Sequence, residues 1–384
     1  MHRTLQASFS VPTTYPVHFT RQVFAPENSI LKEVCSTAGP SARVFTVVDS
    51  GAARAFPDLP SRIQCWARRH DVRLVTAPVI LEGGEAVKNN YRSLMTVMDQ
   101  LLEHHLCRHS VLLALGGGAM LDAVGLAASL LHRGIRIIRL PSTTLAQNDA
   151  GIGVKTGMNL HGLKNAIGTF APPLAVINDL DLLNGLPDAR WRDGISEAFK
   201  VALIKDADFY RELLTLAPAL GRREQTAMES LIVRCAALHL DHISNSGDPF
   251  EQGSARPLDF GHWSAHKLES MSNYRISHGE AVAIGISLDT LIAEQLSFVP
   301  AGTADPLIHA LRQCGFDLHP PELEERLGDG SLRLIQGLEE FREHLGGTLT
   351  LSFPSPVGSM TELHGLEPER IEGAVQRIRA CACA

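Results

Sequence analysis

The sequence has no long apolar run, no long block of one charge sign and few aromatic residues. Phe, Trp and Tyr make up only 5% of the 384 residues, and the formal net charge of −7 is spread along the chain. Nucleic-acid recognition requires a clustered basic surface, which these scattered charges do not predict. The longest apolar stretch, residues 111–131, is interrupted by a glycine triplet and contains Asp122, so we expect no membrane-spanning helix.

Cysteine is also sparse and shows no regular spacing. The seven cysteines are odd in number and scattered between residues 35 and 383. This pattern argues against a disulfide framework and favours a reducing compartment. Residues 1–19 lack the apolar core of a signal peptide, so we expect a cytoplasmic protein.

The length predicts two domains, because 384 residues exceed what one ordinary hydrophobic core covers. In residues 1–184, short apolar runs alternate with helical patterns. This alternation is typical of an α/β domain with a mostly parallel, Rossmann-like sheet and helices on both faces. The predicted strands are 43–51, 72–80, 110–118, 135–147 and 172–183.

Residues 185–384 show a different pattern, in which helical spacing dominates. We therefore predict that this part forms a mainly α-helical domain with at most a small strand pair. The predicted helices are 189–214, 226–243, 262–272, 279–296 and 306–315, and the predicted strand is 347–353.

Three glycines, Gly116, Gly117 and Gly118, follow a predicted strand and precede a predicted helix in the stretch LALGGGAMLD. Glycine lets the backbone approach a pyrophosphate, and a helix N-terminus offers free N–H groups with a partial positive charge. The spacing differs from the G-x-G-x-x-G fingerprint of the standard dinucleotide site. A tight turn that needs positive φ angles is the alternative explanation.

Polar residues follow the other predicted strands as well. Ligands of parallel sheets bind at the carboxyl ends of the strands, so a row of polar residues there predicts a nucleotide site. Ordinary surface loops, which are also polar, are the alternative. The residues are Asp49, Glu85, Lys88, Thr143 and Thr144.

The segment 147–170 combines five glycines with Asp149, Lys155, Lys164 and Asn165. Glycines permit close backbone approach, and two lysines with an amide can hold a phosphate. The alternative is a solvated loop in which the lysines have no function.

In the predicted helix 262–272, His262, His266 and Glu269 lie at i, i+4 and i+7 and therefore share one face. That face meets a metal ion, a substrate phosphate or solvent. The H-E-x-x-H signature of metalloproteases is absent, because Trp263 stands in place of the glutamate.

Glu197 and Lys200 lie on adjacent turns of another predicted helix, within GISEAFKVALIKD. With His262 and His278, Glu197 would form a two-histidine, one-carboxylate metal set of the kind that leaves a coordination position open for catalysis. A chance grouping is the alternative, since the chain contains 17 histidines.

Several motifs occur in one order along residues 43–290: ALGGGAMLD, KNAIGTF, GISEAFKVALIKD, DFGHWSAHKLE and HGEAVAIG. In this order the chain resembles the 3-dehydroquinate synthase-like sugar phosphate cyclases. It looks especially like the dehydroquinate-synthase-like proteins encoded in ebo clusters.

The resemblance implies a role for each set of residues. It implies one divalent metal ion, zinc or cobalt, held by Glu197, His262 and His278. It implies NAD bound by Asp49, Glu85, Lys88, Gly116, Gly117, Gly118, Asp122, Thr143 and Thr144. It implies substrate phosphate at Asn165 and at Arg133, the arginine coming from the partner of a homodimer. The reacting carbons would be lined by Asp149, Lys155, Lys164, Lys200 and His266.

The implied reaction has no net redox change. NAD oxidises a secondary alcohol whose oxygen the metal ion polarises. Phosphate then leaves by β-elimination, the hydride returns, and an intramolecular aldol step closes a carbocycle. Lysines and the metal ion stabilise the developing oxyanions.

The chain departs from the 3-dehydroquinate synthase pattern just before His262. Asp259 stands where those enzymes have asparagine, and Arg256 is one residue out of register with their arginine. An aspartate would repel the carboxylate of the dehydroquinate synthase substrate, which favours a substrate without a carboxylate.

Two further positions differ. Asp259 also occurs in cyclases that act on sedoheptulose 7-phosphate, such as 2-epi-5-epi-valiolone synthase, but those enzymes usually have proline where this chain has His266. Arg190 replaces a glutamate that is common in the adenine-side loop of the family.

We therefore expect a cyclase for a heptulose 7-phosphate similar to sedoheptulose 7-phosphate. The alternatives are a 3-dehydroquinate synthase with a rearranged carboxylate site, a metal-dependent NAD polyol dehydrogenase, and a non-catalytic binding protein that retains the fold. The expected partner is a small phosphorylated sugar, with no nucleic acid and no membrane.

Overall fold

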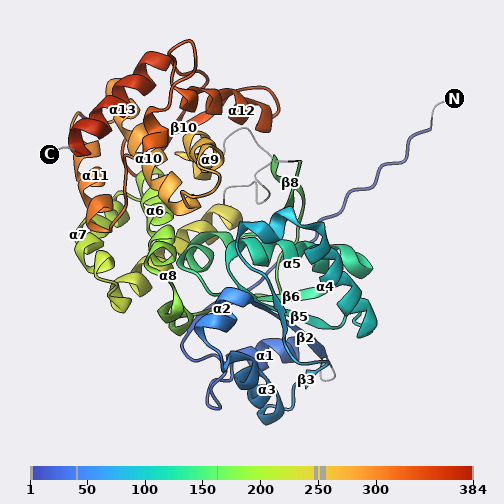
Figure 1. The fold of residues 1–384 in the computed structure, drawn as a ribbon. Coiled ribbons are helices and arrows are strands. Elements are labelled where there is room, and N and C mark those ends of the chain that lie inside the picture. Colours follow the sequence, from blue (N-terminus) through green and yellow to red (C-terminus); the bar gives the residue numbers. More distant parts are fainter. Residues whose placement is uncertain (1–2, 40–41, 162, 246–249, 251–256, 383–384) are drawn as a thin grey trace.

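The computed structural model describes residues 3–39, 42–161, 163–245, 250 and 257–382. The chain forms a sheet-containing part followed by a helical part, which lie side by side in Figure 1. The predicted boundary after residue 184 falls within the short helix η4 (Leu180–Gly185), between the last strand of the main sheet and the first helix of the helical part.

The main sheet is parallel throughout its described strands, which confirms the predicted α/β class. Its strand order is β1-β9-β6-β5-β2-β3, and β4 also pairs with β2. The strands are β1 (Val17–Thr20), β2 (Arg43–Asp49), β3 (Arg73–Leu74), β4 (Val79–Leu81), β5 (Val111–Gly116), β6 (Arg136–Pro141) and β9 (Ala175–Asp179).

Alternation along the central strands explains why helices cover both faces. Phe45 of β2 and Leu112 of β5 belong to one hydrophobic cluster, with α4 and α5, whereas Val44 and Leu113 belong to the cluster on the other face, with α1 and α3. The helices of this part are α1 (Ile30–Thr37), α2 (Ser50–Ala55), α3 (Leu59–Arg69), α4 (Tyr91–Glu103) and α5 (Gly118–Leu130).

Several features differ from the sequence-based prediction. The predicted strand 135–147 ends at Pro141 and is followed by the short helix η3 (Ala146–Ala150). The predicted helix 189–214 is two helices, Asp188–Lys205 and Ala207–Gly221. The predicted strand 72–80 is two short strands, β3 and β4, separated by a bend before Pro78. Strand β1, which pairs with β9, was not expected. The predicted loop 147–170 contains an antiparallel hairpin of β7 (Lys155–Leu160) and β8 (Leu163–Phe170).

Two glycines of this segment serve the hairpin. Gly157 and Gly168 lie opposite each other in its register, and a Cβ on Gly157 would meet Ile167 O at 2.9 Å. These two glycines, which contributed to the loop prediction, therefore permit close pairing of two strands.

The helical part contains α6 (Asp188–Lys205), α7 (Ala207–Gly221), α8 (Gln225–Asn245), α9 (His262–Met271), α10 (His278–Gln295), α11 (Ala304–Gln313), α12 (Gln336–His344) and α13 (Pro368–Ala382). One small antiparallel pair, β10 (Leu351–Pro354) and β11 (Met360–Leu363), accompanies them. Within the described ranges, no helix combines the length and apolar composition that crossing a membrane requires.

Glycines bring α6, α9 and α10 into direct backbone contact. A Cβ on Gly279 of α10 would overlap the backbone of Asp193 in α6. A Cβ on Gly285 of α10 would overlap the carbonyl of Gly261, the residue before α9. Packing this close fixes the relative positions of the three helices.

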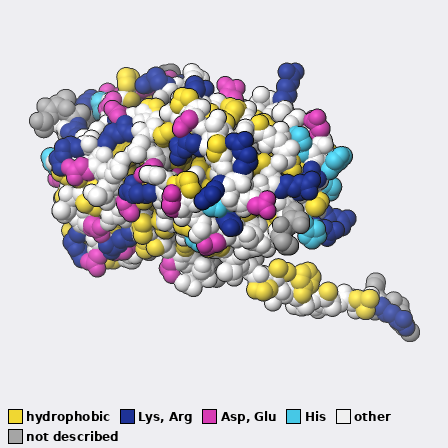
Figure 2. Space-filling model, turned by 90° about the horizontal axis from the view of Figure 1, so that it is seen from below, with side chains coloured by type: hydrophobic (Ala, Val, Ile, Leu, Met, Phe, Trp, Pro, Cys, Tyr) yellow, Lys and Arg dark blue, Asp and Glu magenta, His cyan; other side chains and the backbone are white. Residues whose placement is uncertain are grey.

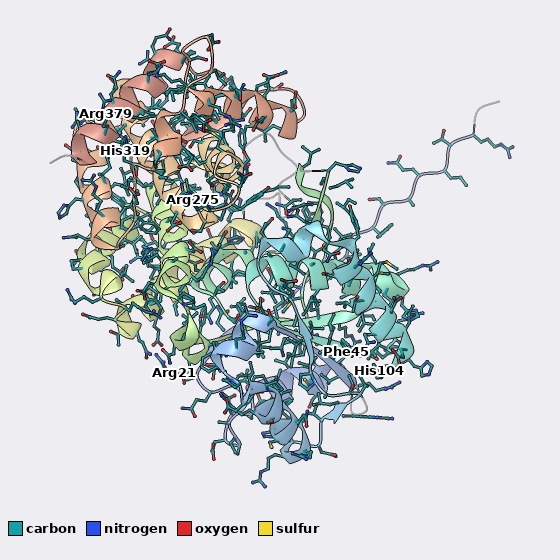
Figure 3. All side chains as sticks on the ribbon, in the orientation of Figure 1. Arg21, Phe45, His104, Arg275, His319 and Arg379 are labelled. Carbon is teal, nitrogen blue, oxygen red and sulfur yellow. The ribbon has the colours of Figure 1, made fainter. Side chains whose placement is uncertain are left out.

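Charged side chains connect the two parts and spread over the surface. Arg21, labelled in Figure 3, pairs with Asp181 next to the sheet and with Glu229 of α8, each at 2.7 Å. On the face seen in Figure 2, lysine and arginine are intermixed with aspartate and glutamate.

Asp289 is a buried acid that joins α10 to the start of α9. Its Oδ1 accepts a hydrogen bond from Trp263 Nε1 at 2.9 Å, and its Oδ2 accepts one from Gly261 N at 3.0 Å. Burial raises the pKa of the Asp289 carboxyl to about 7, although the two N–H donors act in the opposite direction. The folded protein therefore holds a proton that the unfolded chain releases near pH 4.

The contribution of Asp289 to stability is complete below the unfolded pKa and is lost as the pH rises through 7. We expect the free energy of unfolding of the wild type, minus that of Asp289→Asn, to fall by about 2–3 kcal/mol between pH 5 and 8. Urea unfolding across this range, with a metal chelator present, measures the difference. The exposed Asp305→Asn is the control, and a flat difference for Asp289→Asn contradicts the prediction.

Candidate functional site

A cleft of about 790 Å³ lies between the sheet part and the helical part. It opens at the carboxyl ends of β2, β5 and β6, where parallel sheets bind their ligands. Its size is within the range of small-molecule and cofactor sites. The predicted site residues that line it are Asp49, Glu85, Lys88, Gly117, Gly118, Asp122, Thr143, Asn165 and His278.

The glycine triplet forms the turn from β5 into α5. Gly117 is the residue before the helix, and Gly118 is its first residue. The first N–H groups of α5 therefore point toward the cleft with the partial positive charge of the helix end. This arrangement can bind a pyrophosphate.

Asp49 ends β2 and caps α2, where its Oδ1 accepts a hydrogen bond from Gly51 N at 2.6 Å. The cleft continues beyond it along Phe56, Leu182 and Leu186. A carboxylate beside an apolar surface can bind a ribose hydroxyl and the face of an adenine ring.

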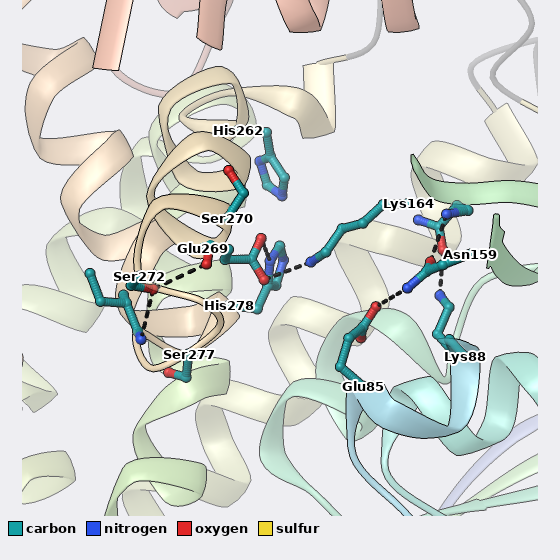
Figure 4. Close-up of polar contacts among 12 residues, drawn as sticks. Glu85, Lys88, Asn159, Lys164, His262, Glu269, Ser270, Ser272, Ser277 and His278 are labelled. Carbon is teal, nitrogen blue, oxygen red and sulfur yellow. Dashed lines mark hydrogen bonds and ion pairs between the residues drawn. The ribbon is translucent and has the colours of Figure 1, made fainter. Parts of the chain in front are cut away.

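Lys88 is buried and links η1 (Glu85–Asn89) to α5 and to the hairpin. Its Nζ pairs with Asp122 Oδ2 at 2.7 Å and donates to Asn165 Oδ1. Asn159 donates to Glu85 at 2.8 Å and accepts from the backbone N–H of Asn165 at 2.9 Å. Figure 4 shows how this network fixes β7 and β8 against η1.

Gly116, Thr144 and Arg133 are among the predicted residues that lie outside the lining of the cleft. A Cβ on Gly116 would meet Met120 Cε at 2.5 Å, so this glycine serves packing. The buried Thr144 hydroxyl donates to Arg190 O at 2.9 Å and joins the loop after β6 to α6. Arg133 is exposed beyond the far end of α5, and the rise of an α-helix puts it roughly 20 Å from the glycine turn.

Glu197 of α6 is the centre of a second cluster, on the helical side of the cleft. The residue is 1% exposed, and neither of its carboxylate oxygens receives a hydrogen bond of good geometry. Lys200 forms an ion pair with it, and His278 Nε2 and His262 Nε2 lie 3.3 and 3.7 Å from its Oε1. Burial, the largest single effect, would raise the pKa of Glu197, but Lys200, His278 and His262 together outweigh it and the pKa falls to about 2.

His262 and His278 are the first residues of α9 and α10. His262 Nδ1 lies 3.0 Å from Phe260 O, and His278 Nδ1 lies 3.3 Å from Glu269 Oε2, so both rings turn Nε2 toward Glu197. One ligand atom from each of the three residues falls within 4.8 Å of the others. A buried carboxylate without good hydrogen bonds, facing two histidine nitrogens, fits a zinc-type cation with an open position.

Among the described residues, a second group also has one possible ligand atom per residue within 4.8 Å of the others. It consists of His266, Glu269 and His278. Both carboxylate oxygens of Glu269 are already used, by Lys164 at 2.6 Å and by His278 at 3.3 Å. The Glu197 group is therefore the better cation site.

Asp149 and His266 lie beside this cluster. Burial alone would raise the pKa of Asp149, but Lys200 and a His239 ring 2.7 Å away lower it strongly. Burial and the neighbouring His262 keep the pKa of His266 well below its usual value, so its ring is neutral. The ring centroids of His262 and His266 lie 5.4 Å apart.

Three further predicted residues are Asp259, Lys155 and Arg256. Asp259 is half-buried in η5 (Pro257–Asp259), near enough to act electrostatically on Lys200 and His262. Lys155 is exposed at the start of β7. Arg256 lies outside the described residues.

Two polar residues at the site were given no role by the sequence. His239 of α8 is one of 17 histidines and belongs to no motif, so only its contact with Asp149 identifies it. Glu269 shares a helix face with His262 and His266. This spacing is visible in the sequence, but it did not by itself indicate a role for Glu269.

Family models match most of the chain. The one described as 3-dehydroquinate synthase N-terminal matches residues 78–193, and the one described as 3-dehydroquinate synthase C-terminal matches residues 194–329.

Individual relatives cover the chain to different extents. A 2-epi-5-epi-valiolone synthase from Actinomyces sp is 29% identical over 97% of each chain. The 3-dehydroquinate synthase of Aeropyrum pernix is 37% identical over 72% of this chain and 74% of its own. ValA, a 2-epi-5-epi-valiolone synthase from Streptomyces hygroscopicus solved with NAD+ and Zn2+ bound, has the same fold, with a TM-score of 0.86 at 24% identity over 98% of this chain and 100% of that chain.

The two candidate metal groups share only His278, so mutation of the histidine that is unique to each group separates them. We expect His262→Ala to weaken Zn2+ binding by more than about 100-fold, because it removes a direct ligand, whereas loss of an outer partner typically costs 10–100-fold. His266→Ala should retain the affinity within about threefold. Competition with a chromophoric chelator measures both, and the opposite order of losses would assign the ion to the Glu269 group.

Proposed function

The chain belongs to the 3-dehydroquinate synthase family, and from this premise we propose that it is an NAD- and metal-dependent sugar phosphate cyclase acting on a heptulose 7-phosphate that lacks a carboxylate. One observation carries the proposal: His278 lines the same cleft as the glycine turn and Asp49, and it also faces the buried Glu197. A bound substrate in that cleft would therefore meet a cofactor and a metal ion at once.

The residues around the cleft fit both a divalent metal ion and NAD. Glu197, His262 and His278 would hold one divalent ion, zinc or cobalt. The glycine turn, Asp49 and the apolar side of the cleft would hold NAD. When bound, NAD supplies reversible hydride transfer, and the ion supplies a Lewis acid.

Residues in and beside the cleft also offer groups for the rest of the substrate. Lys164 and Asn165 of β8 would bind phosphate. Lys88 would hold the Asn165 side chain in place, because its Nζ donates a hydrogen bond to Asn165 Oδ1. Lys200 remains protonated, because Glu197 and Asp149 outweigh burial and raise its pKa. Together with Lys155 it would stabilise developing oxyanions, and Asp149 and the neutral His266 would orient the hydroxyls or move protons.

Arg133 supports a homodimer. The cleft of its own chain is roughly 20 Å away along α5, so contact with a substrate phosphate requires a second subunit. In the single chain the Arg133 side chain is exposed, so it is accessible to a second subunit.

Asp259 supports the choice of substrate. Its charge acts on Lys200 and His262, so it lies within the same cluster. Two carboxylates about 4 Å apart repel each other by about 4 kcal/mol at an effective dielectric constant of 20. A hydroxyl-rich, uncharged end of the substrate avoids this repulsion. A 3-dehydroquinate synthase activity is the second candidate, favoured by the family models and by the Aeropyrum pernix relative.

Release of inorganic phosphate tests the proposal directly. The purified protein with NAD and Zn2+ or Co2+ should release phosphate from sedoheptulose 7-phosphate and not from the 3-deoxy-heptulosonate phosphate of the shikimate route. Release from the second substrate alone would make the protein a dehydroquinate synthase. Accumulation of NADH without phosphate release would indicate a polyol dehydrogenase, because a cyclase regenerates NAD in each turnover.

Asp259→Asn tests the specificity argument. Removal of the negative charge should raise kcat/KM for the carboxylate-bearing substrate at least tenfold relative to sedoheptulose 7-phosphate, about 1.4 kcal/mol of transition-state stabilisation. Parallel steady-state assays of both substrates give the ratio. An unchanged ratio would show that Asp259 does not set the preference.

A further inference from the structure

Glu269 lies between two groups of residues: the candidate metal ligands Glu197, His262 and His278, and the hairpin β7–β8 that carries Lys164 and Asn165. We propose that it is a positioning residue that couples the two, one carboxylate oxygen fixing the ring of His278 and the other holding Lys164 until phosphate arrives. This inference rests on the proposed function and deepens it.

The contacts of Glu269 use both of its oxygens. Oε2 lies 3.3 Å from His278 Nδ1, and Oε1 lies 2.6 Å from Lys164 Nζ. The side chain of Glu269 is only 4% exposed. Figure 4 shows the Glu269 carboxylate next to the His278 ring, with a dashed line that marks the contact to Lys164.

The first contact determines which nitrogen of His278 is available. A hydrogen bond from Nδ1–H to Glu269 leaves the lone pair on Nε2, which faces Glu197 at 3.3 Å. Carboxylate partners of this kind orient a histidine ligand and make it a stronger donor to a metal ion.

The second contact crosses the cleft. Lys164 belongs to β8 of the sheet part, whereas Glu269 belongs to α9 of the helical part. The lysine side chain is 21% exposed and its Nζ lies 5.6 Å from the ring centre of Tyr274, so it borders the opening of the cleft. A substrate phosphate would compete with Glu269 for this ammonium group.

The two contacts share one negative charge, which produces the coupling. While Lys164 is paired with Glu269, part of that charge is neutralised. When phosphate takes Lys164, the full charge acts on His278 and strengthens its bond to the ion. Phosphate and metal should therefore increase each other's affinity by the same factor.

Glu269→Gln tests the positioning role without using activity. The variant should bind Zn2+ 10–100-fold more weakly than the wild type, the range for loss of an outer partner. It should also shift the visible spectrum of bound Co2+, because the His278 ring loses its orientation. Glu269→Asp should recover part of both. These measurements need neither NAD nor sugar phosphate, so a failed cyclase assay leaves them interpretable.

Glu340→Gln is the matched control. Glu340 of α12 pairs at 2.5 Å with Lys267 of α9, the helix that carries Glu269. Its loss removes a similar Glu–Lys pair and should leave Zn2+ affinity and the Co2+ spectrum unchanged. Wild-type affinity in Glu269→Gln, or equal losses in both variants, would overturn the proposal.

Inorganic phosphate tests the coupling. Saturating phosphate should tighten Zn2+ binding severalfold in the wild type and not in Glu269→Gln or Lys164→Met. The same tightening in all three proteins would overturn the coupling, because phosphate would then act directly on the ion. A loss of affinity in His266→Ala as large as in Glu269→Gln would make Glu269 a metal ligand and not a positioning residue.

Discussion

The buried negative charge of Glu197 is the constraint on which the candidate site depends. A carboxylate that is almost fully removed from water must be compensated by positive charge, or it takes up a proton. Here Lys200 and the two histidines surround it, and the carboxylate stays ionised. The arrangement supplies one fixed ammonium group and a space between the carboxylate and two ring nitrogens that suits a cation.

Such a charge is tolerable only if its neighbours cannot move away. The backbone contacts at Gly279 and Gly285 hold α6, α9 and α10 together without intervening side chains. Asp289, one turn after Gly285 on α10, also ties the start of α9 to α10. The helix starts that carry His262 and His278 are therefore set by packing, and a larger residue at either glycine would separate the groups that balance Glu197.

The sequence predicted the larger features because each has a strong local pattern. The alternation of strands and helices, the glycine turn before α5 and the polar strand ends all follow from residues close together in the chain. The hairpin β7–β8 was missed because glycine is the usual signal of a loop, whereas here it permits two strands to lie close. His239 and the two partners of Glu269 could not be predicted, since those contacts join residues 9 to 105 positions apart whose neighbourhood only the tertiary fold determines.

The metal-type residues and the nucleotide-type residues occupy separate stretches of the chain. Glu197, His262 and His278 all come from the helical part, whereas the glycine turn and Asp49 come from the sheet part. Each half therefore contributes the main residues of one recognition element, and the cleft between them is lined by both. In evolutionary terms, the reaction carried out at this junction can be altered by substitutions beside the cleft, such as those at residues 190 and 259, while the candidate metal ligands and the glycine turn are inherited unchanged.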